Sequence, residues 1–146
     1  EGWYRQPFGC CRTRWVDGCL EFLTVRDNIF QIRQRLQPFD AVKYRTFRIR
    51  MRVRPNAAIG LGHYEKKGIA MRLKWGTTMN PIIGLGNAVD FQECIASCPV
   101  TADGQFHEYA IDLASEWDWY GEVNELWFEA VNVSHAVVDI DWMRFE

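Results

Sequence analysis

Apolar and polar residues alternate with a period of two along several short segments of this chain, which is typical of β-strands that bury one face. The clearest example is the segment 46–54. Its apolar residues are Phe47, Ile49, Met51 and Val53, and the residues between and after them are Arg48, Arg50, Arg52 and Arg54. The pattern predicts a strand with one face in the core and four arginines on the other face.

Similar patterns predict further strands, and helical periodicity is nearly absent. These strands cover residues 19–25, 29–33, 68–75, 106–113, 125–133 and 136–145. We expect the first two to form a hairpin around residues 26–28. The segment 76–104 is rich in Gly and Asn and is predicted to be a long loop. Short strands separated by turn residues predict an all-β fold, either a sandwich or a barrel.

Length and charge limit the alternatives. A chain of 146 residues with 48% apolar content is enough for one packed core, so we expect a single domain over residues 1–146. Lys and Arg number 17 and Asp and Glu number 19, which gives a net charge of -2. This balance argues against nucleic acid as a partner. No apolar run approaches the length of about 20 residues that a membrane span requires, so no membrane partner is expected.

The five cysteines form two clusters, Cys10, Cys11 and Cys19 in one and Cys94 and Cys98 in the other. In an oxidising compartment we expect local disulfides, from Cys19 to Cys10 or Cys11 and between Cys94 and Cys98. A four-thiolate zinc site is less favoured, because neither cluster has the C-x2-C spacing of a zinc knuckle. Buried thiols in a cytosolic protein are the remaining alternative.

The four arginines of segment 46–54 repel one another unless acidic groups lie beside them. The acidic residues with suitable alternation lie on two later strands and are Glu108, Asp112, Asp139 and Asp141. A lattice of salt bridges between neighbouring strands is the structural interpretation. In the functional interpretation, Arg50 and Arg52 bind sugar hydroxyls or uronate carboxylates, which the planar guanidinium suits.

Aromatic residues are the second set of candidates, because the C–H face of a sugar ring packs against an aromatic ring. Trp127 lies between Leu126 and Phe128, so it shares a strand face with Glu129 rather than with the core. We expect Trp127 to be a platform for sugar and Glu129 to be its polar neighbour.

The loop 115–121 holds three further aromatic residues, Trp117, Trp119 and Tyr120. Burying all three in one loop is difficult, and we expect Trp117 and Tyr120 to contact a ligand. Trp75 and Trp142 instead continue apolar alternations and are expected in the core.

Catalytic motifs are absent from the sequence. It contains no G-x-S-x-G segment, no phosphate-binding loop, and no helical metal motif among its three histidines. Pairs of carboxylates such as Glu108 with Asp112 would suit glycoside hydrolysis at the right separation. Acidic residues that alternate along strands are more often solvated, so we expect no enzyme activity.

Several segments resemble the galactose-binding-like jelly-roll carbohydrate-binding modules that are attached to secreted bacterial polysaccharide-degrading enzymes. They are ADGQFHEYAIDL at 102–113, WYGEV at 119–123, LWFE at 126–129, VVDIDWMRF at 137–145 and the strand at 44–54. The resemblance implies a β-sandwich jelly roll of two antiparallel sheets, with Trp119 in a structural role. It also implies a structural calcium ion, for which Asp139 and Asp141 are the candidate ligands.

The leading hypothesis is a non-catalytic module that binds polysaccharide or oligosaccharide and targets an attached secreted enzyme to its glycan substrate. This implies parent enzyme domains in the same chain and an extracellular location. One alternative is a structural or protein-interaction sandwich of a secreted or surface assembly. A polysaccharide-degrading catalytic domain is the third hypothesis.

Overall fold

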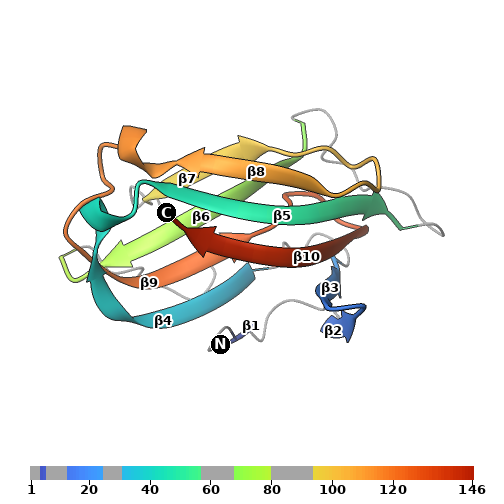
Figure 1. Cartoon of the computed structure of the whole chain (residues 1–146), viewed down its shortest axis with the longest axis horizontal. Helices are drawn as coiled ribbons and strands as arrows, with labels where there is room; N and C mark the ends of the chain where they lie inside the picture. The colour runs from blue at the N-terminus through green and yellow to red at the C-terminus, as the bar shows by residue number, and fades with distance from the viewer. Residues whose placement is uncertain (1–3, 6–12, 25–30, 57–67, 80–93) are drawn as a thin grey trace.

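The computed structural model describes residues 4–5, 13–24, 31–56, 68–79 and 94–146. Within these ranges the chain forms two stacked five-stranded sheets whose strands pair antiparallel (Figure 1). The β9 sheet has the order β1 (Tyr4–Arg5), β4 (Gln31–Asp40), β9 (Glu122–Glu129), β6 (Ala70–Thr77), β7 (Ile95–Pro99). The β5 sheet has the order β2 (Thr13–Val16), β3 (Cys19–Leu23), β10 (Ala136–Phe145), β5 (Thr46–Pro55), β8 (His107–Asp112).

Most consecutive strands lie in different sheets. Among the described strands, only β2 with β3 and β6 with β7 are paired sequence neighbours. This repeated crossing between two antiparallel sheets is the jelly-roll arrangement. Two short 3-10 helices, η1 (Ala41–Lys43) and η3 (Leu113–Ser115), lie at one end of the sandwich (Figure 1). None of the helices in the described ranges has the length and apolar character of a membrane span.

The core lies between the sheets and confirms the predicted alternation of two strands. The four apolar residues of β5 are fully buried, whereas its arginines are only partly covered. In β6 the large buried apolar side chains are Met71, Leu73 and Trp75. Both strands therefore direct their apolar faces inward, and β5 directs its arginines away from the core.

The predicted hairpin at 19–33 is wrong. β3 pairs with β2 and β10, whereas β4 pairs with β1 and β9 in the other sheet. The hairpin that does form joins β2 to β3 through Asp17 and Gly18, both of which have positive φ. An Asp-Gly pair between two strands is a strong hairpin signal, because both turn positions require a left-handed backbone.

Two other expectations about strands need correction. The segment 76–104 is not one long loop, because β7 lies within it and pairs with β6. The strand expected at 125–133 is β9, which begins and ends a few residues earlier, at Glu122–Glu129. The strand expected at 136–145 is confirmed as β10.

The prediction that Trp142 lies in the core is wrong, whereas Trp75 is buried as expected. Between Ile140 and Trp142 the pairing of β10 with β5 shifts by one residue, which is a β-bulge. A bulge adds one residue to a strand and so reverses the alternation beyond it. Trp142 lies opposite Arg50, on the outer face, while Met143 lies opposite the buried Ile49.

The predicted disulfide between Cys94 and Cys98 is also wrong, since the Cys98 thiol is free. Cys94 and Cys98 are four residues apart along extended chain at β7, roughly 13 Å, whereas a disulfide joins Cα atoms less than about 7 Å apart. The Cys19 thiol is free as well. Its predicted partners, Cys10 and Cys11, lie outside the described residues.

Candidate functional site

The outer face of the β9 sheet carries Trp127 and Glu129. As predicted, both point away from the core side that holds Leu126 and Phe128. Trp127 is only 7% exposed and Glu129 only 2%. The Trp127 indole nitrogen donates to Glu125 Oε1 at 3.3 Å, and Arg72 Nη1 lies 3.5 Å from Glu129 Oε1. Trp127 is therefore an embedded side chain in this structure, not an open platform.

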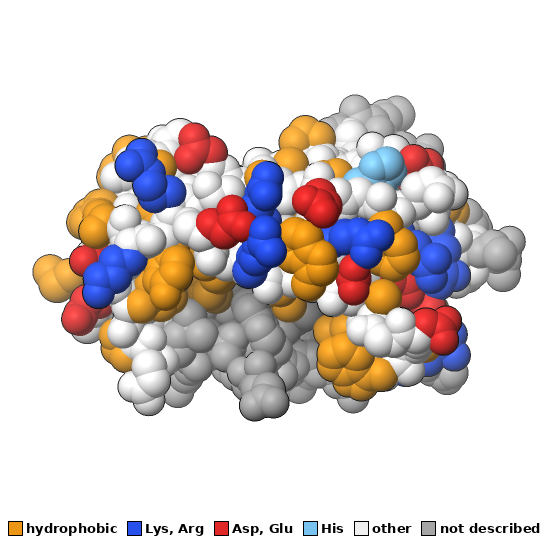
Figure 2. All heavy atoms as spheres, viewed as in Figure 1, with side chains coloured by type: hydrophobic (Ala, Val, Ile, Leu, Met, Phe, Trp, Pro, Cys, Tyr) orange, Lys and Arg blue, Asp and Glu red, His pale blue; other side chains and the backbone are white. Residues whose placement is uncertain are grey.

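The arginines of β5 lie on the opposite side of the sandwich, on the outer face of the β5 sheet. The sequence candidates therefore do not form one site, because Arg50 and Arg52 are separated from Trp127 and Glu129 by the whole core. Figure 2 shows basic and acidic side chains mixed with hydrophobic ones in a band across the face formed by β5 and β10.

The predicted salt-bridge lattice is present on this face. Arg50 bonds to Asp141, and Arg52 Nε donates to Asp139 Oδ2 at 2.7 Å. Arg54 Nη2 is 3.2 Å from the same oxygen. The hydrogen bond to Asp139 raises the pKa of Arg52. Of the acids expected on the other strand, Asp112 accepts a hydrogen bond from the Ala114 N–H at the start of η3.

Two aromatic residues of this face were missed as candidates. The guanidinium carbons of Arg50 and Arg52 lie 4.9 and 4.8 Å from the centroid of the Phe106 ring, and that of Arg144 lies 4.7 Å from the Trp142 ring. Phe106 alternates in phase with the exposed Glu108, which was an available signal. The outward position of Trp142 depends on the bulge and had no such signal.

Asp139 and Asp141, the candidate calcium ligands, are engaged by arginine side chains. In the described part of the chain, no group of three or more His, Cys, Asp or Glu residues is placed to hold a metal ion. A calcium site needs several oxygens that are not committed to cations. The described residues do not fit such a site, so calcium binding stays a prediction that only the resemblance supports.

The loop between η3 and β9 presents Trp117 and Tyr120 to solvent, 74% and 61% exposed. Trp119 between them is buried, which agrees with a structural role. Its indole nitrogen donates to the carbonyl oxygens of Ala41 and Tyr44 at 2.9 and 2.7 Å. The buried Trp119 side chain therefore anchors the loop, and the side chains of Trp117 and Tyr120 point outward.

Two more contacts hold this loop to its neighbours, and a third lies within the loop. The Trp75 indole nitrogen donates to the Asp118 carbonyl oxygen at 3.2 Å, the Ala41 N–H donates to the Gly121 carbonyl at 2.9 Å, and the Trp119 N–H donates to the Glu116 carbonyl at 3.1 Å. Backbone held in this way positions an exposed ring before a ligand arrives.

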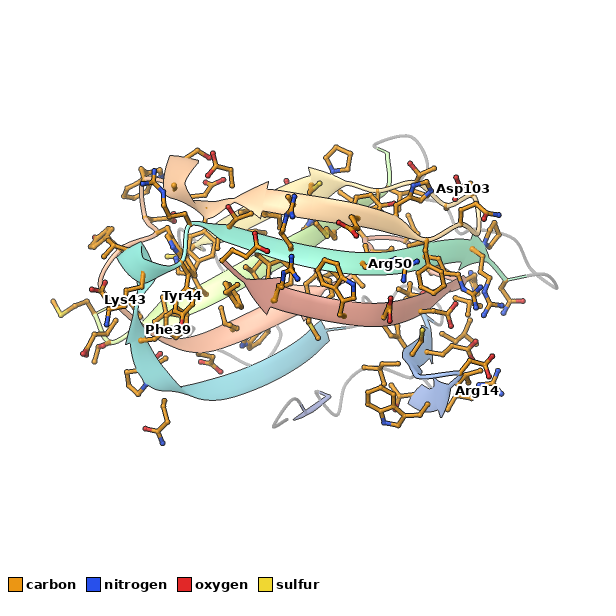
Figure 3. The ribbon with its side chains drawn as sticks, in the orientation of Figure 1. Arg14, Phe39, Lys43, Tyr44, Arg50 and Asp103 are labelled. Atoms are coloured by element: carbon orange, nitrogen blue, oxygen red, sulfur yellow. The ribbon has the colours of Figure 1, made fainter. Side chains whose placement is uncertain are left out.

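The same end of the sandwich also carries acidic and apolar groups. Burial, followed by the nearby carboxylates of Asp118 and Asp112, raises the pKa of Glu116. Figure 3 shows Phe39, Lys43 and Tyr44 together at this end, around η1 and the start of β5. Their chain neighbour Val42 is exposed. Aromatic rings beside carboxylates are the chemistry that sugars need, namely a surface for C–H groups and acceptors for hydroxyls.

No family model and no curated protein matches the sequence. Solved structures do match the fold. A family 29 carbohydrate-binding module matches with a TM-score of 0.60 at 10% identity, over 98% of this chain and 77% of that chain. A variant of such a module in complex with cellulohexaose matches with a TM-score of 0.60 at 10% identity, over 98% and 79% of the two chains.

A third match is a variant in complex with mannohexaose, with a TM-score of 0.57 at 9% identity, over 97% of this chain and 79% of that chain. The chain has the fold of a family 29 carbohydrate-binding module. Because the identities are so low, the likeness establishes the fold and leaves the ligand of this chain to be argued from its own residues.

Proposed function

We propose that this chain is a non-catalytic carbohydrate-binding module that binds polysaccharide or oligosaccharide at the loop end, through Trp117 and Tyr120. The observation that carries the proposal is the strong exposure of these two rings on a loop that buried Trp119 anchors. Trp117 and Tyr120 are exposed together on one anchored loop, unlike the single exposed ring of Trp15, and grouped apolar exposure marks ligand-binding surfaces.

The fold and the sequence resemblance support the same proposal. The structural neighbours include modules in complex with cellulohexaose and mannohexaose. We extend the proposal to the wider context that the resemblance implies, in which the module is secreted and targets an attached polysaccharide-degrading enzyme to its glycan.

The test is a binding assay on the purified chain with cellulohexaose and mannohexaose, followed by a broader glycan panel. Trp117→Ala and Tyr120→Ala are each expected to weaken binding about tenfold, because loss of one ring contact removes roughly 1–2 kcal/mol. Their thermal unfolding should stay close to that of the parent, since both side chains are mostly solvated.

The matched control is Trp15→Ala. Trp15 lies on β2 and is 75% exposed, close to the exposure of Trp117. The control substitution therefore removes the same kind of side chain from a different part of the molecule. It should leave glycan binding unchanged. Absence of binding across the whole panel, or equal losses for Trp15→Ala and Trp117→Ala, would overturn the proposal.

A further inference from the structure

Four charged residues form a straight row across the outer face of the β5 sheet. Strand register places Arg14 of β2 opposite Glu21 of β3, Glu21 opposite Asp139 of β10, and Asp139 opposite Arg52 of β5. Two acids thus lie side by side on adjacent strands, with an arginine on each flank. Arg54 joins them, with Nη2 at 2.7 Å from Glu21 Oε2 and at 3.2 Å from Asp139 Oδ2.

Within this row the acids are buried and the arginines are exposed. The side chains of Asp139 and Glu21 are 1% and 10% exposed, whereas those of Arg52, Arg54 and Arg14 are 36%, 39% and 71% exposed. An approaching molecule therefore meets guanidinium groups, and the carboxylates beneath hold those groups in place. Within this cluster three arginines share two acids.

The guanidiniums keep donors for a ligand. In the described part of the chain, the hydrogen bonds of Arg14 and Arg52 to the acids run through Nε. Their terminal nitrogens are thereby left for other acceptors. Because the side chains are already pinned by Glu21 and Asp139, a ligand that binds them loses less side-chain entropy than it would with mobile arginines.

The acids elsewhere on the ladder are more exposed. Arg50 is bonded to Asp141, whose side chain is 32% exposed, and lies opposite the exposed Glu108 in strand register. Arg48 and Arg144 share Glu146, which is 41% exposed. Buried acids beneath exposed guanidiniums are therefore a feature of the Arg14, Arg52 and Arg54 end. Figure 3 shows Arg14 at the hairpin of β2 and β3, far along the molecule from Tyr44 and Lys43 at the loop end.

We propose that Arg14, Arg52 and Arg54 form a second glycan-binding surface, which takes the carboxylate groups of an acidic, uronate-containing polysaccharide. The planar guanidinium fork matches a carboxylate in a two-point contact. Arg52 and Arg54 are two positions apart on β5, roughly 6.6 Å, and Arg14 lies across β3 and β10 from Arg52. Guanidiniums at several separate points of one surface suit a polymer with repeated carboxylates better than a single small anion. This surface is separate from the loop end.

The test compares binding of polygalacturonate with binding of its fully methyl-esterified form, which has the same backbone and no charge. The parent chain should retain polygalacturonate at least about tenfold more strongly, and the difference should shrink at high salt, as for exposed charges. Arg14→Ala combined with Arg54→Lys should reduce polygalacturonate affinity about tenfold, since it removes two guanidinium forks and one positive charge. Binding of neutral hexaoses should not change.

Arg45→Ala is the matched control, because it removes one exposed arginine just before β5, at the opposite end of that strand. It should leave polygalacturonate affinity intact, and thermal unfolding of each variant verifies folding. Equal retention of the esterified polymer, or equal losses for Arg45→Ala and the double variant, would overturn the proposal. Dextran sulfate serves as a second polyanion, and binding as tight as that of polygalacturonate would overturn the assignment to carboxylates.

These results are distinguishable from those of the loop-end test. Failure of Trp117→Ala to weaken binding of neutral hexaoses would remove the loop-end site and leave the arginine surface standing. If Trp117→Ala weakens binding of neutral hexaoses but the parent chain shows no preference for polygalacturonate, the loop-end site stands and the arginine surface is removed.

Discussion

Trp127 has a different role from the exposed platform that its sequence position predicts, and substitution tests this directly. Because the side chain is 7% exposed and its indole nitrogen bonds to Glu125, Trp127→Ala should lower the free energy of unfolding by about 3 kcal/mol. Trp15→Ala, at an exposed tryptophan, should change it by less than about 0.5 kcal/mol. Urea unfolding measures both. Equal stability of the two variants would show that Trp127 is not embedded.

Asp139 and Asp141 offer a second comparison between chemically identical residues. The Asp139 side chain is 1% exposed and holds Arg52 and Arg54, whereas Asp141 is 32% exposed and holds Arg50. Asp139→Asn should cost about 1–3 kcal/mol, because it leaves Arg52 without its buried counter-charge and Arg54 with Glu21 alone. Asp141→Asn should cost less than about 1 kcal/mol, since solvent screens that pair. Similar midpoints of denaturation for the two variants would contradict this order.

Alternation along the sequence correctly assigned the strand face of Trp127, of Asp139 and of the β5 arginines. It could not give their burial, because burial depends on what covers a face, and that comes from other parts of the chain. Trp127 shows this limit: its face was predicted correctly and its exposure was not. Trp142 shows the other limit, because one inserted residue in β10 changes the face of every residue beyond it.

At the scale of elements, the loop from η3 to β9 gives a pH-dependent prediction. Burial and the neighbouring carboxylates raise the pKa of Glu116 above its ordinary value of 4.5. A carboxyl group with a raised pKa favours the folded state when protonated, and this contribution is lost as the pH rises through the raised pKa. Ionised Glu116 therefore destabilises the loop end at neutral pH.

Glu116→Gln should accordingly raise the unfolding temperature at pH 7, and the gain should vanish at a pH below about 4. Glu108→Gln, an exposed acid on β8, is the control for general loss of negative charge. Thermal unfolding of the three proteins across this pH range measures the effect. If Glu116→Gln raises the unfolding temperature equally at pH 7 and below pH 4, ionisation of Glu116 is not the cause.

The sequence pattern predicted strands correctly where one face is buried, but it did not predict which strands pair with each other. The alternation of β5 and β6 is clear because each has an apolar face against the other sheet. The segments 19–25 and 29–33 also contain strands, but adjacency suggested a hairpin, and the jelly roll instead sends β3 and β4 to different sheets. The turn at Asp17 and Gly18 carried the correct hairpin signal.

At the scale of the whole molecule, fold class followed from the strand patterns, whereas the grouping of site residues did not. Arg50 and Trp127 both point away from the core, and alternation alone does not say whether they share one surface. Their strands belong to different sheets, so the surfaces are on opposite sides of the sandwich. Only the order of strands in each sheet tells which outward-facing residues share a surface. The loop end with Trp117 and Tyr120 is a third surface, separate from both sheet faces.

The jelly-roll topology also determines the chemistry of Cys98, which lies in β7, and of Cys94, which directly precedes that strand. Because β7 is extended, Cys94 and Cys98 are too far apart to bond, and peptide mapping without reductant should find no bridge between them. Burial raises the pKa of the Cys98 thiol, and a thiol reacts as its thiolate. Alkylation of Cys98 by iodoacetamide should therefore be at least roughly tenfold slower in the folded protein than in urea. Equal rates in the two conditions would mean that the β7 edge opens readily, and a Cys94–Cys98 peptide would mean that β7 is not a strand in solution.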